Sequence, residues 1–183
     1  GETTPTTFEL LTTFAYLLFK EEKCEWAVIE TGLGGRLDAT NAVDALAAAI
    51  TAVDYDHQQF LGHSIEAIAA EKAAVIKAGG VAVLGENPEV VEAVVVERCR
   101  AVGADLVRAW QDIACTVSMR DGRANLVLST PTRSYAPMRV RLAGRHQVQN
   151  AITAIRLLEA LDARGILAVS EEDIRQAVED VDW

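Results

Sequence analysis

The sequence predicts an α/β fold, in which helices flank a parallel sheet and a small antiparallel β subsheet is attached. In the N-terminal part of the chain, short apolar runs alternate with segments of helical periodicity, a pattern typical of parallel sheets. Two of these runs, at residues 26–29 and 46–53, end in acidic residues, as buried parallel strands do when they bring carboxylates to a sheet edge. Between residues 112 and 142 the pattern becomes that of short antiparallel strands around the turn pair Asp121-Gly122.

The N-terminal elements follow from capping signals and periodicity. A helix should begin near Thr6, because Thr6 and Glu9 form a capping box. Its apolar residues recur at helical spacing, so we expect one face of this helix to be buried. The next helix should begin near Ser64, and Asn87 should cap a third. The expected strands are 26–29, 46–53, 81–84 and 105–107, and the expected helices after the first are 64–77 and 88–101.

The C-terminal elements are predicted in the same way. After the antiparallel strands, a long helix should open near His146 and stop before Gly165, and its apolar residues form a stripe at helical spacing. A last helix should begin at Ser170, because three acidic residues fill its first turn, where they favour the positive end of the helix dipole. The expected strands are 115–119, 124–128 and 135–142, and the long helix is expected over 146–163.

Composition excludes several classes of protein. The 183 residues are enough to bury a sizeable core, and we predict a single domain over residues 1–183. A net charge of −10 disfavours binding to nucleic acid or to an anionic membrane, and no apolar run approaches the roughly 20 residues of a transmembrane helix. The three cysteines are widely spaced and form no C-x-x-C pair, which fits a cytoplasmic protein without disulfides or a zinc site.

The most informative stretch is E-T-G-L-G-G-R-L-D-A-T-N, residues 30–41. Glu30 follows an apolar run, and a carboxylate at the end of a strand can hold Mg²⁺. Gly34 and Gly35 allow backbone N–H groups to approach an anion closely. The stretch is not a dinucleotide fingerprint, which needs glycine or alanine in place of Leu37, and it is not a P-loop. The alternative interpretation is a tight strand-to-helix turn beside a solvated Glu30.

Three further stretches carry reactive or polar side chains. Asp54, Asp56 and His57 could bind a divalent metal, or they could be ordinary polar residues after a strand. Lys72 lies among small apolar residues, so its ammonium could simply reach water, or its neutral amine could react with CO₂ to form a carbamate. The polar residues 144–150 could read a nucleobase edge, or they could simply cap a helix.

Taken together, these stretches resemble one family, folylpolyglutamate synthase/dihydrofolate synthase, within the wider group of Mur ligases. The resemblance covers nearly the whole chain, and the long string at residues 30–41 is its most specific part. The other motifs stand in family order: Phe8-Glu9 with Thr12-Thr13 and Phe14, Asp56-His57, Leu61-Gly62, Glu71-Lys72-Ala73 with Ile76-Lys77, Gly144-x-His146-Gln147-x-Gln149-Asn150, and Asp182-Trp183.

The resemblance implies an ATP-dependent ligase that joins an acid to an amino acid. The γ-phosphoryl group of ATP would move to a carboxylate of dihydropteroate or of a reduced folate. The amino group of L-glutamate would then attack the acyl phosphate, and the products would be an amide, ADP and phosphate. Such an enzyme must hold the phosphates with Mg²⁺, align two substrates and keep water away from the acyl phosphate.

The resemblance also implies roles for individual residues. Glu30 and His57 match Mg²⁺ ligands, and His57 is also expected to take part in catalysis. Lys72 matches the lysine that family members carbamylate to support a second metal, and it is expected to be catalytic as well. The residues expected to bind the nucleotide are the adenine-pocket group Asn150, His146 and Gln147, and the group Gly34, Gly35 and Arg36 at the active-site edge.

Two parts of the family pattern have no counterpart in residues 1–183. The P-loop, with its phosphate-binding lysine, should precede residue 1, and the C-terminal domain should follow Trp183. The resemblance therefore implies a P-loop NTPase-like Mur ligase central, ATP-binding domain without these two parts. We expect this domain to be inactive by itself, and the intact enzyme to be a monomer.

Three alternatives stay open on the sequence. Another Mur-type amide ligase, acting on a peptidoglycan precursor or on cyanophycin, would share the fold but not the string at residues 30–41. A metal-dependent phosphohydrolase could be built on Asp54, Asp56 and His57, although such a site calls for more His and Asp ligands than these. A non-catalytic relic that binds a partner would have no need of an intact metal site.

Overall fold

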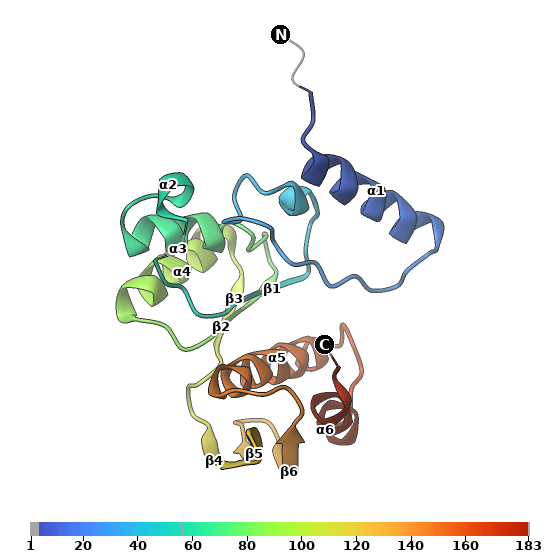
Figure 1. Cartoon of the computed structure of the whole chain (residues 1–183), viewed down its shortest axis with the longest axis vertical. Coiled ribbons are helices and arrows are strands. Elements are labelled where there is room, and N and C mark those ends of the chain that lie inside the picture. Colours follow the sequence, from blue (N-terminus) through green and yellow to red (C-terminus); the bar gives the residue numbers. More distant parts are fainter. Residues whose placement is uncertain (1–3, 56, 183) are drawn as a thin grey trace.

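The computed structural model describes residues 4–55 and 57–182. This part of the chain contains one parallel and one antiparallel sheet, each of three strands, with helices packed against both (Figure 1). The predicted fold class is therefore confirmed. Asp56 and Trp183, which belong to motifs of the sequence, lie outside the described residues.

The parallel sheet has the strand order β1-β2-β3. Ala47 pairs with Val81 and Val81 pairs with Asp105, so the three strands start level with one another. Their carboxyl ends therefore meet at one edge of the sheet, which is where ligands of open α/β sheets collect. The strands are β1 (Ala47–Ile50), β2 (Val81–Leu84) and β3 (Asp105–Arg108).

The central strand β2 is buried on both faces. Val81 and Val83 belong to a hydrophobic cluster with α5 and the antiparallel sheet, whereas Ala82 and Leu84 belong to a second cluster with α3 and α4. Successive side chains of a strand point to opposite faces, so four consecutive apolar residues serve two cores at once. The helices of these two layers are α3 (Ile65–Ala73), α4 (Glu89–Val102) and α5 (Arg145–Ala163).

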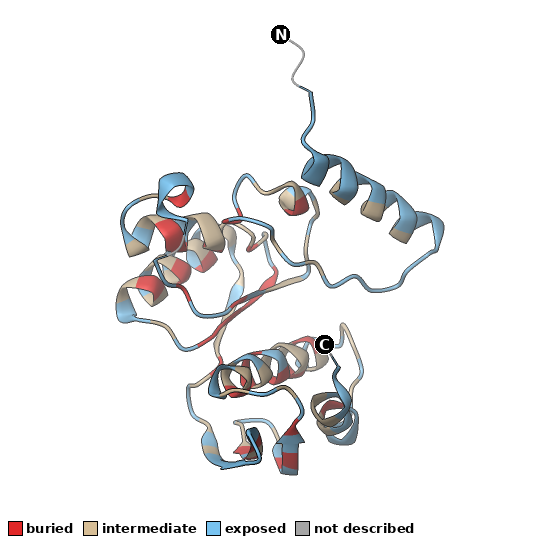
Figure 2. Ribbon diagram, viewed as in Figure 1, coloured by how far each residue is buried: buried red, intermediate tan, exposed pale blue. Residues whose placement is uncertain are grey.

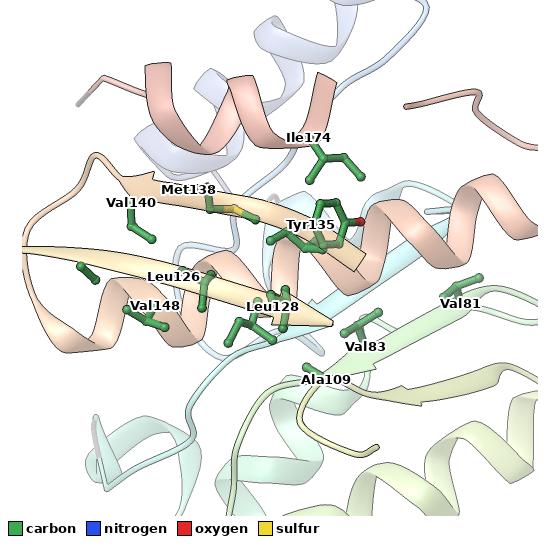
Figure 3. Packing of buried hydrophobic residues seen from close by; sticks show 13 residues of the cluster. Val81, Val83, Ala109, Leu126, Leu128, Tyr135, Met138, Val140, Val148 and Ile174 are labelled. Carbon is green, nitrogen blue, oxygen red and sulfur yellow. The ribbon is translucent and has the colours of Figure 1, made fainter. Parts of the chain in front are cut away.

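The antiparallel sheet packs on the side of α5 that faces away from the parallel sheet (Figure 1). Its first hairpin turns at Asp121 and Gly122, both with positive φ, as a two-residue turn of type I′ requires. Leu126 and Leu128 are 0% exposed and lie in one cluster with Val81 and Val83 of β2 (Figure 3). The elements of this half are β4 (Ala114–Arg120), β5 (Arg123–Ser129), β6 (Ser134–Val140) and α6 (Glu171–Asp180).

A buried carboxylate ties this sheet to α5. Glu159 is 4% exposed, and its carboxylate accepts hydrogen bonds from Thr130 Oγ1 at 2.7 Å, Tyr135 OH at 2.9 Å and Arg156 Nη1 at 2.6 Å. Burial, together with the neighbouring carboxylate, raises the pKa of Tyr135. The charge is thus paired and hydrogen-bonded, which is the condition under which a buried carboxylate is tolerated.

The first helix, α1 (Thr7–Glu21), has the predicted capping box but not the predicted buried face. Thr6 Oγ1 accepts from the N–H of Glu9, and the Glu9 carboxylate accepts from the N–H of Thr6. No residue of α1 is buried, and Phe14 is 64% exposed (Figure 2). The reason is that α1 lies apart from both cores and rests on η1 (Ala39–Ala42), where Tyr16 OH donates to the carbonyl of Thr40.

The predicted strand at residues 26–29 is wrong. The segment is extended but belongs to neither sheet, Trp26 is 54% exposed, and Val28 is 100% exposed. A strand needs a partner for its N–H and C=O groups, and in the described residues β1 pairs only with β2. The two acid-ended runs are therefore not neighbouring strands of one sheet.

Two helix boundaries also differ from the prediction. Asn87 does not cap α4, because its Oδ1 accepts from the N–H of Val53 at 2.8 Å and its Nδ2 donates to the carbonyl of Thr51 at 2.7 Å. It thus joins the chain after β2 to the chain after β1. The helix α3 ends at Ala73 instead of Lys77, because the N–H groups of Val75 and Ile76 bond three residues back and tighten the last turn. Among the helices of the described residues, none is both long and apolar enough to cross a membrane.

Candidate functional site

The glycine loop, residues 32–36, lies against α3 and against α2 (Gln58–Leu61). Gly34 has φ +67°, a backbone conformation that favours glycine, and a Cβ there would come within 2.6 Å of Leu61 Cδ2. A Cβ on Gly35 would come within 2.6 Å of the Glu71 carbonyl oxygen and 2.9 Å of Val75 Cγ1. Both glycines are buried, so their lack of a side chain serves close packing of the loop onto the two helices.

Residues 36–41, which follow the glycine loop, are attached at both ends to α3 and to the turn after it. Arg36 donates from its N–H to the carbonyl of Glu71 at 3.0 Å and from Nε to the Glu71 carboxylate at 2.8 Å. Asn41 Nδ2 donates to the carbonyl of Arg36 at 3.2 Å, and Lys77 Nζ donates to the carbonyl of Asn41 at 2.8 Å. The segment is therefore held at several points along one side of α3 and the turn that follows it.

Asp38 joins the glycine loop to the chain that follows it. Its carboxylate accepts from the N–H of Leu33 at 2.9 Å and from the N–H of Thr40 at 3.0 Å. Partial burial acts to raise the pKa of Asp38, but the hydrogen bonds from Thr40, Leu33 and Gly32 outweigh it and hold the pKa below its usual range. The carboxylate is thus kept ionised, and it closes the loop onto η1.

Lys72 lies in the last turn of α3, directly after the residue that holds Arg36. Its backbone carbonyl is 3.2 Å from the position that a Cβ of Gly35 would take, so the glycine loop and this turn are in contact. The side chain is partly buried, and its ammonium has no hydrogen bond or ion pair within the described ranges. The amine is therefore not committed to a carboxylate of this part of the chain.

Glu30 and His57, the predicted metal pair, come from two different segments. Glu30 is exposed at the end of the extended segment that precedes the glycine loop. His57 is the N-cap residue of α2 with φ 49°, and its carbonyl accepts from the N–H groups of Phe60 and Leu61. Because Leu61 packs against Gly34, α2 links His57 to the same loop. Apart from Asp56, which lies outside the described residues, no group of three or more His, Cys, Asp or Glu side chains could hold a metal ion.

The predicted adenine group stands together at the start of α5. Asn150 Nδ2 donates to Gln147 Oε1 at 3.3 Å, and the His146 Nε2 and Gln147 Nε2 atoms are 3.2 Å apart. Next to them, Gln149 Nε2 donates to the Glu86 carboxylate, just after β2, at 2.8 Å. This places the start of α5 beside the carboxyl end of the central strand, which is a favoured position for a ligand in such sheets.

Comparison with known proteins decides the family. The pattern of the Mur ligase middle domain matches residues 1–158. The chain belongs to the Mur ligase family. Dihydrofolate synthetase of Saccharomyces cerevisiae is 34% identical to it, in a match that covers 97% of the chain and 41% of that protein. Dihydrofolate synthase/folylpolyglutamate synthase of Bacillus subtilis is also 34% identical, over 98% of the chain and 42% of that protein.

Solved structures give the same result. An FPGS–AMPPCP–folate complex matches with a TM-score of 0.93 and 29% identity, over 98% of the chain and 44% of that protein. The chain thus spans less than half the length of these relatives. The described contacts form two groups among the predicted residues. One lies around the glycine loop and α3, and the other lies at the start of α5. Glu30 is not joined to either group by a hydrogen bond or ion pair in the described residues.

Three residues that tie segments together near the predicted residues make contacts that the sequence did not predict. Asp38 and Glu71 were expected only as parts of motifs and Asn87 only as a helix cap, but each bonds backbone groups elsewhere in the chain. Asp38 could have been found, because Asp two residues before Thr40 is the signature of a turn in which the carboxylate accepts from the backbone. Glu71 and Asn87 bond residues about 35 positions away, a separation for which local pattern carries no signal.

Proposed function

We propose that the complete protein is an ATP-dependent ligase that joins L-glutamate to dihydropteroate, to a reduced folate, or to both. The observation that carries the proposal is the 34% identity to dihydrofolate synthetase and to dihydrofolate synthase/folylpolyglutamate synthase over at least 97% of the chain. The match to a complex with AMPPCP and folate supports ATP and a folate as ligands. The same relatives disfavour a phosphohydrolase and a ligase for another substrate.

Mg²⁺ is the metal that this reaction requires and that the donor set fits. Glu30 offers an exposed carboxylate without a partner in the described part of the chain, and His57 lies on the helix packed against the glycine loop. Mg²⁺ keeps several waters and takes phosphate oxygens as ligands, so few protein ligands are sufficient. When bound there, the metal would neutralise the charge of the phosphates. A carbamate on Lys72 would add an anionic oxygen for a second metal.

The protein residues would bind and orient the reactants. The amide groups of Asn150 and Gln147, with His146, present donors and acceptors that suit the edge of adenine. Arg36, whose side chain is 57% exposed while it bonds Glu71, would line the edge of the site near the phosphates. The amino group of glutamate must reach the acyl phosphate before water does, so the two substrates have to be held in line. We further propose that the protein acts as a monomer in the cytoplasm.

The test is glutamate-dependent release of ADP by the complete protein, with Mg²⁺ and ATP, when dihydropteroate and a reduced folate are offered in turn. We expect turnover with at least one acceptor, and none from residues 1–183 alone. Lys72→Ala should lower kcat by about 10²–10³-fold, as loss of one group that stabilises transition-state charge does. Lys20→Ala, on the exposed last turn of α1, is the matched control and should leave kcat unchanged.

One result would contradict this function, and another would change only the role of Lys72. A folded protein that binds ATP but turns over neither acceptor would point to another Mur-type substrate. Full activity of Lys72→Ala would remove Lys72 from the catalytic group while leaving the ligase reaction in place.

A further inference from the structure

The glycine loop is fastened to α3 mainly through one residue, Glu71. The backbone carbonyl of Glu71 accepts from the N–H of Arg36 at 3.0 Å, and its carboxylate accepts from Arg36 Nε at 2.8 Å. The Glu71 side chain is 22% exposed and that of Arg36 is 57% exposed, so the carboxylate is the more sheltered partner. Two bonds from one residue to its partner fix both the distance and the orientation of the loop.

The same point of the loop is also closely packed. A Cβ on Gly35 would stand 2.6 Å from the Glu71 carbonyl oxygen and 3.2 Å from that of Lys72, so the loop backbone lies directly on this turn of α3. The turn itself is anchored in the core, because Ile68 and Ala73 of α3 are at most 1% exposed. The position of the loop relative to Lys72 is therefore set by the contact between Arg36 and Glu71.

We propose that Glu71 is a positioning residue: through Arg36, its carboxylate fixes the glycine loop relative to the turn of α3 that carries Lys72. The loop is continuous with Glu30, so the contact would also set the distance between Glu30 and Lys72. This inference rests on the proposed function, in which these two residues serve one Mg²⁺–nucleotide site. Partly exposed ion pairs contribute little to stability, so loss of this one should alter the site more than the fold.

The test is Glu71→Gln in the complete protein, because glutamine keeps the shape and the backbone carbonyl but loses the charge. We expect the Mg²⁺ concentration for half-maximal rate to rise and kcat to fall, each by about tenfold, as when a group that orients a metal ligand is removed. The KM for ATP at saturating Mg²⁺ should change little, because the predicted adenine group is on α5. Glu92→Gln, which breaks the ion pair of Glu92 with Arg108 on α4 and β3, is the matched control and should change none of these values.

A binding measurement separates this inference from the proposed function. Mn²⁺ in place of Mg²⁺ can be titrated by electron paramagnetic resonance with ATP present and no acceptor. Weaker Mn²⁺ binding in Glu71→Gln but not in Glu92→Gln supports the positioning role even if neither folate acceptor is turned over. Wild-type Mn²⁺ binding and Mg²⁺ dependence in Glu71→Gln would overturn it, while the ligase reaction would stand.

Swapping the charges of Arg36 and Glu71 distinguishes a loss of positioning from a loss of folding. Arg36→Glu and Glu71→Arg should each weaken Mn²⁺ binding, and the double variant should recover part of it if the ion pair positions the loop. No recovery in a double variant with the wild-type melting temperature would overturn the inference. Equal loss in Glu71→Gln and Glu92→Gln would do so as well, because a general loss of stability would then explain both.

Discussion

The helices α1 and α6 begin in the same way but have different surroundings. In α1, Thr6 and Glu9 exchange the two hydrogen bonds of a capping box, and in α6 Ser170 and Asp173 do the same. No residue of α1 is buried, whereas Ile174 of α6 is 1% exposed. The comparison teaches that a capping box and apolar periodicity start a helix, but they do not decide whether the helix is packed.

The two helices differ in the backbone groups that lie close enough to bond them. The N–H of Arg141, just after β6, donates to the carbonyl of Val178, and the N–H of Arg139 donates to the Glu179 carboxylate, both at 3.2 Å. The open edge of β6 thus receives α6. In the described residues, the hydrogen bond that joins α1 to another element is the one that Tyr16 OH donates to the carbonyl of Thr40 in η1.

The largest expected difference between the two helices lies in their apolar residues. Ile174→Ala should lower the free energy of unfolding by about 2–5 kcal/mol, because it leaves a cavity in the core. Phe14→Ala should change it by no more than about 0.5 kcal/mol, because the side chain is already 64% exposed. Urea unfolding of residues 1–183 measures both. An equal loss of stability for Phe14→Ala would show that α1 is packed in solution. The same substitution in the complete protein would show whether segments outside residues 1–183 cover the apolar face of α1.

A smaller difference is expected from the capping residues. Ser170→Ala should cost about 1 kcal/mol of global stability, because α6 is part of the cooperative core. Thr6→Ala removes the same kind of hydrogen bond, but fraying of α1 exposes no core, so the urea midpoint should stay unchanged while helicity at 222 nm falls. A shift of the midpoint with Thr6→Ala equal to that with Ser170→Ala would mean that the two helices unfold together.

The smallest effect is expected from pH. Hydrogen bonds from Thr6 lower the pKa of Glu9, and hydrogen bonds from Ser170 lower the pKa of Asp173. Each carboxylate therefore contributes stability above the pKa of the unfolded group, about 4, and this is lost as pH falls through the folded pKa. NMR titration of the two carboxyl groups should show both pKa values lowered. Below pH 5 the helicity should fall in both helices. The urea midpoint should also fall, because α6 is part of the core, whereas loosening of α1 should not affect it. Unshifted titrations of both groups would rule this out.

The part of the fold that the sequence predicted well is the part where local pattern and packing agree. The strand at 81–84 is found as predicted, because four apolar residues in a row suit a strand with both faces covered. The Asp121-Gly122 turn is likewise found, because its two positive φ angles depend on those two residues alone. The run at 26–29 has a similar composition, yet it finds no strand to pair with in the described residues. Composition thus indicates that a segment can be buried as a strand, but neighbouring strands and helices decide whether it is.

The sequence predicted which residues belong to the candidate site, but not which of them contact one another. The motif order brought Gly35, Arg36 and Lys72 into one hypothesis. In the structure Gly35 lies against the Lys72 carbonyl, and Arg36 bonds the preceding residue, Glu71. That Glu71 is the point of attachment could not be read from the pattern, because its bond to Arg36 spans 35 positions. Asn87 shows the same limit, since its side chain suits a helix cap but finds partners after β1 instead.

The sharing of β2 between two cores has a consequence for cutting the chain. A break in the connection at residues 109–113 would leave the parallel sheet in one piece, and the antiparallel sheet with α5 in the other. The first piece would expose Val81 and Val83 of β2, and the second would expose the face of α5 that covers them. Each piece would thus expose the apolar surface that the other piece covers. The two pieces should therefore associate as the halves of a split protein, and neither should fold stably alone.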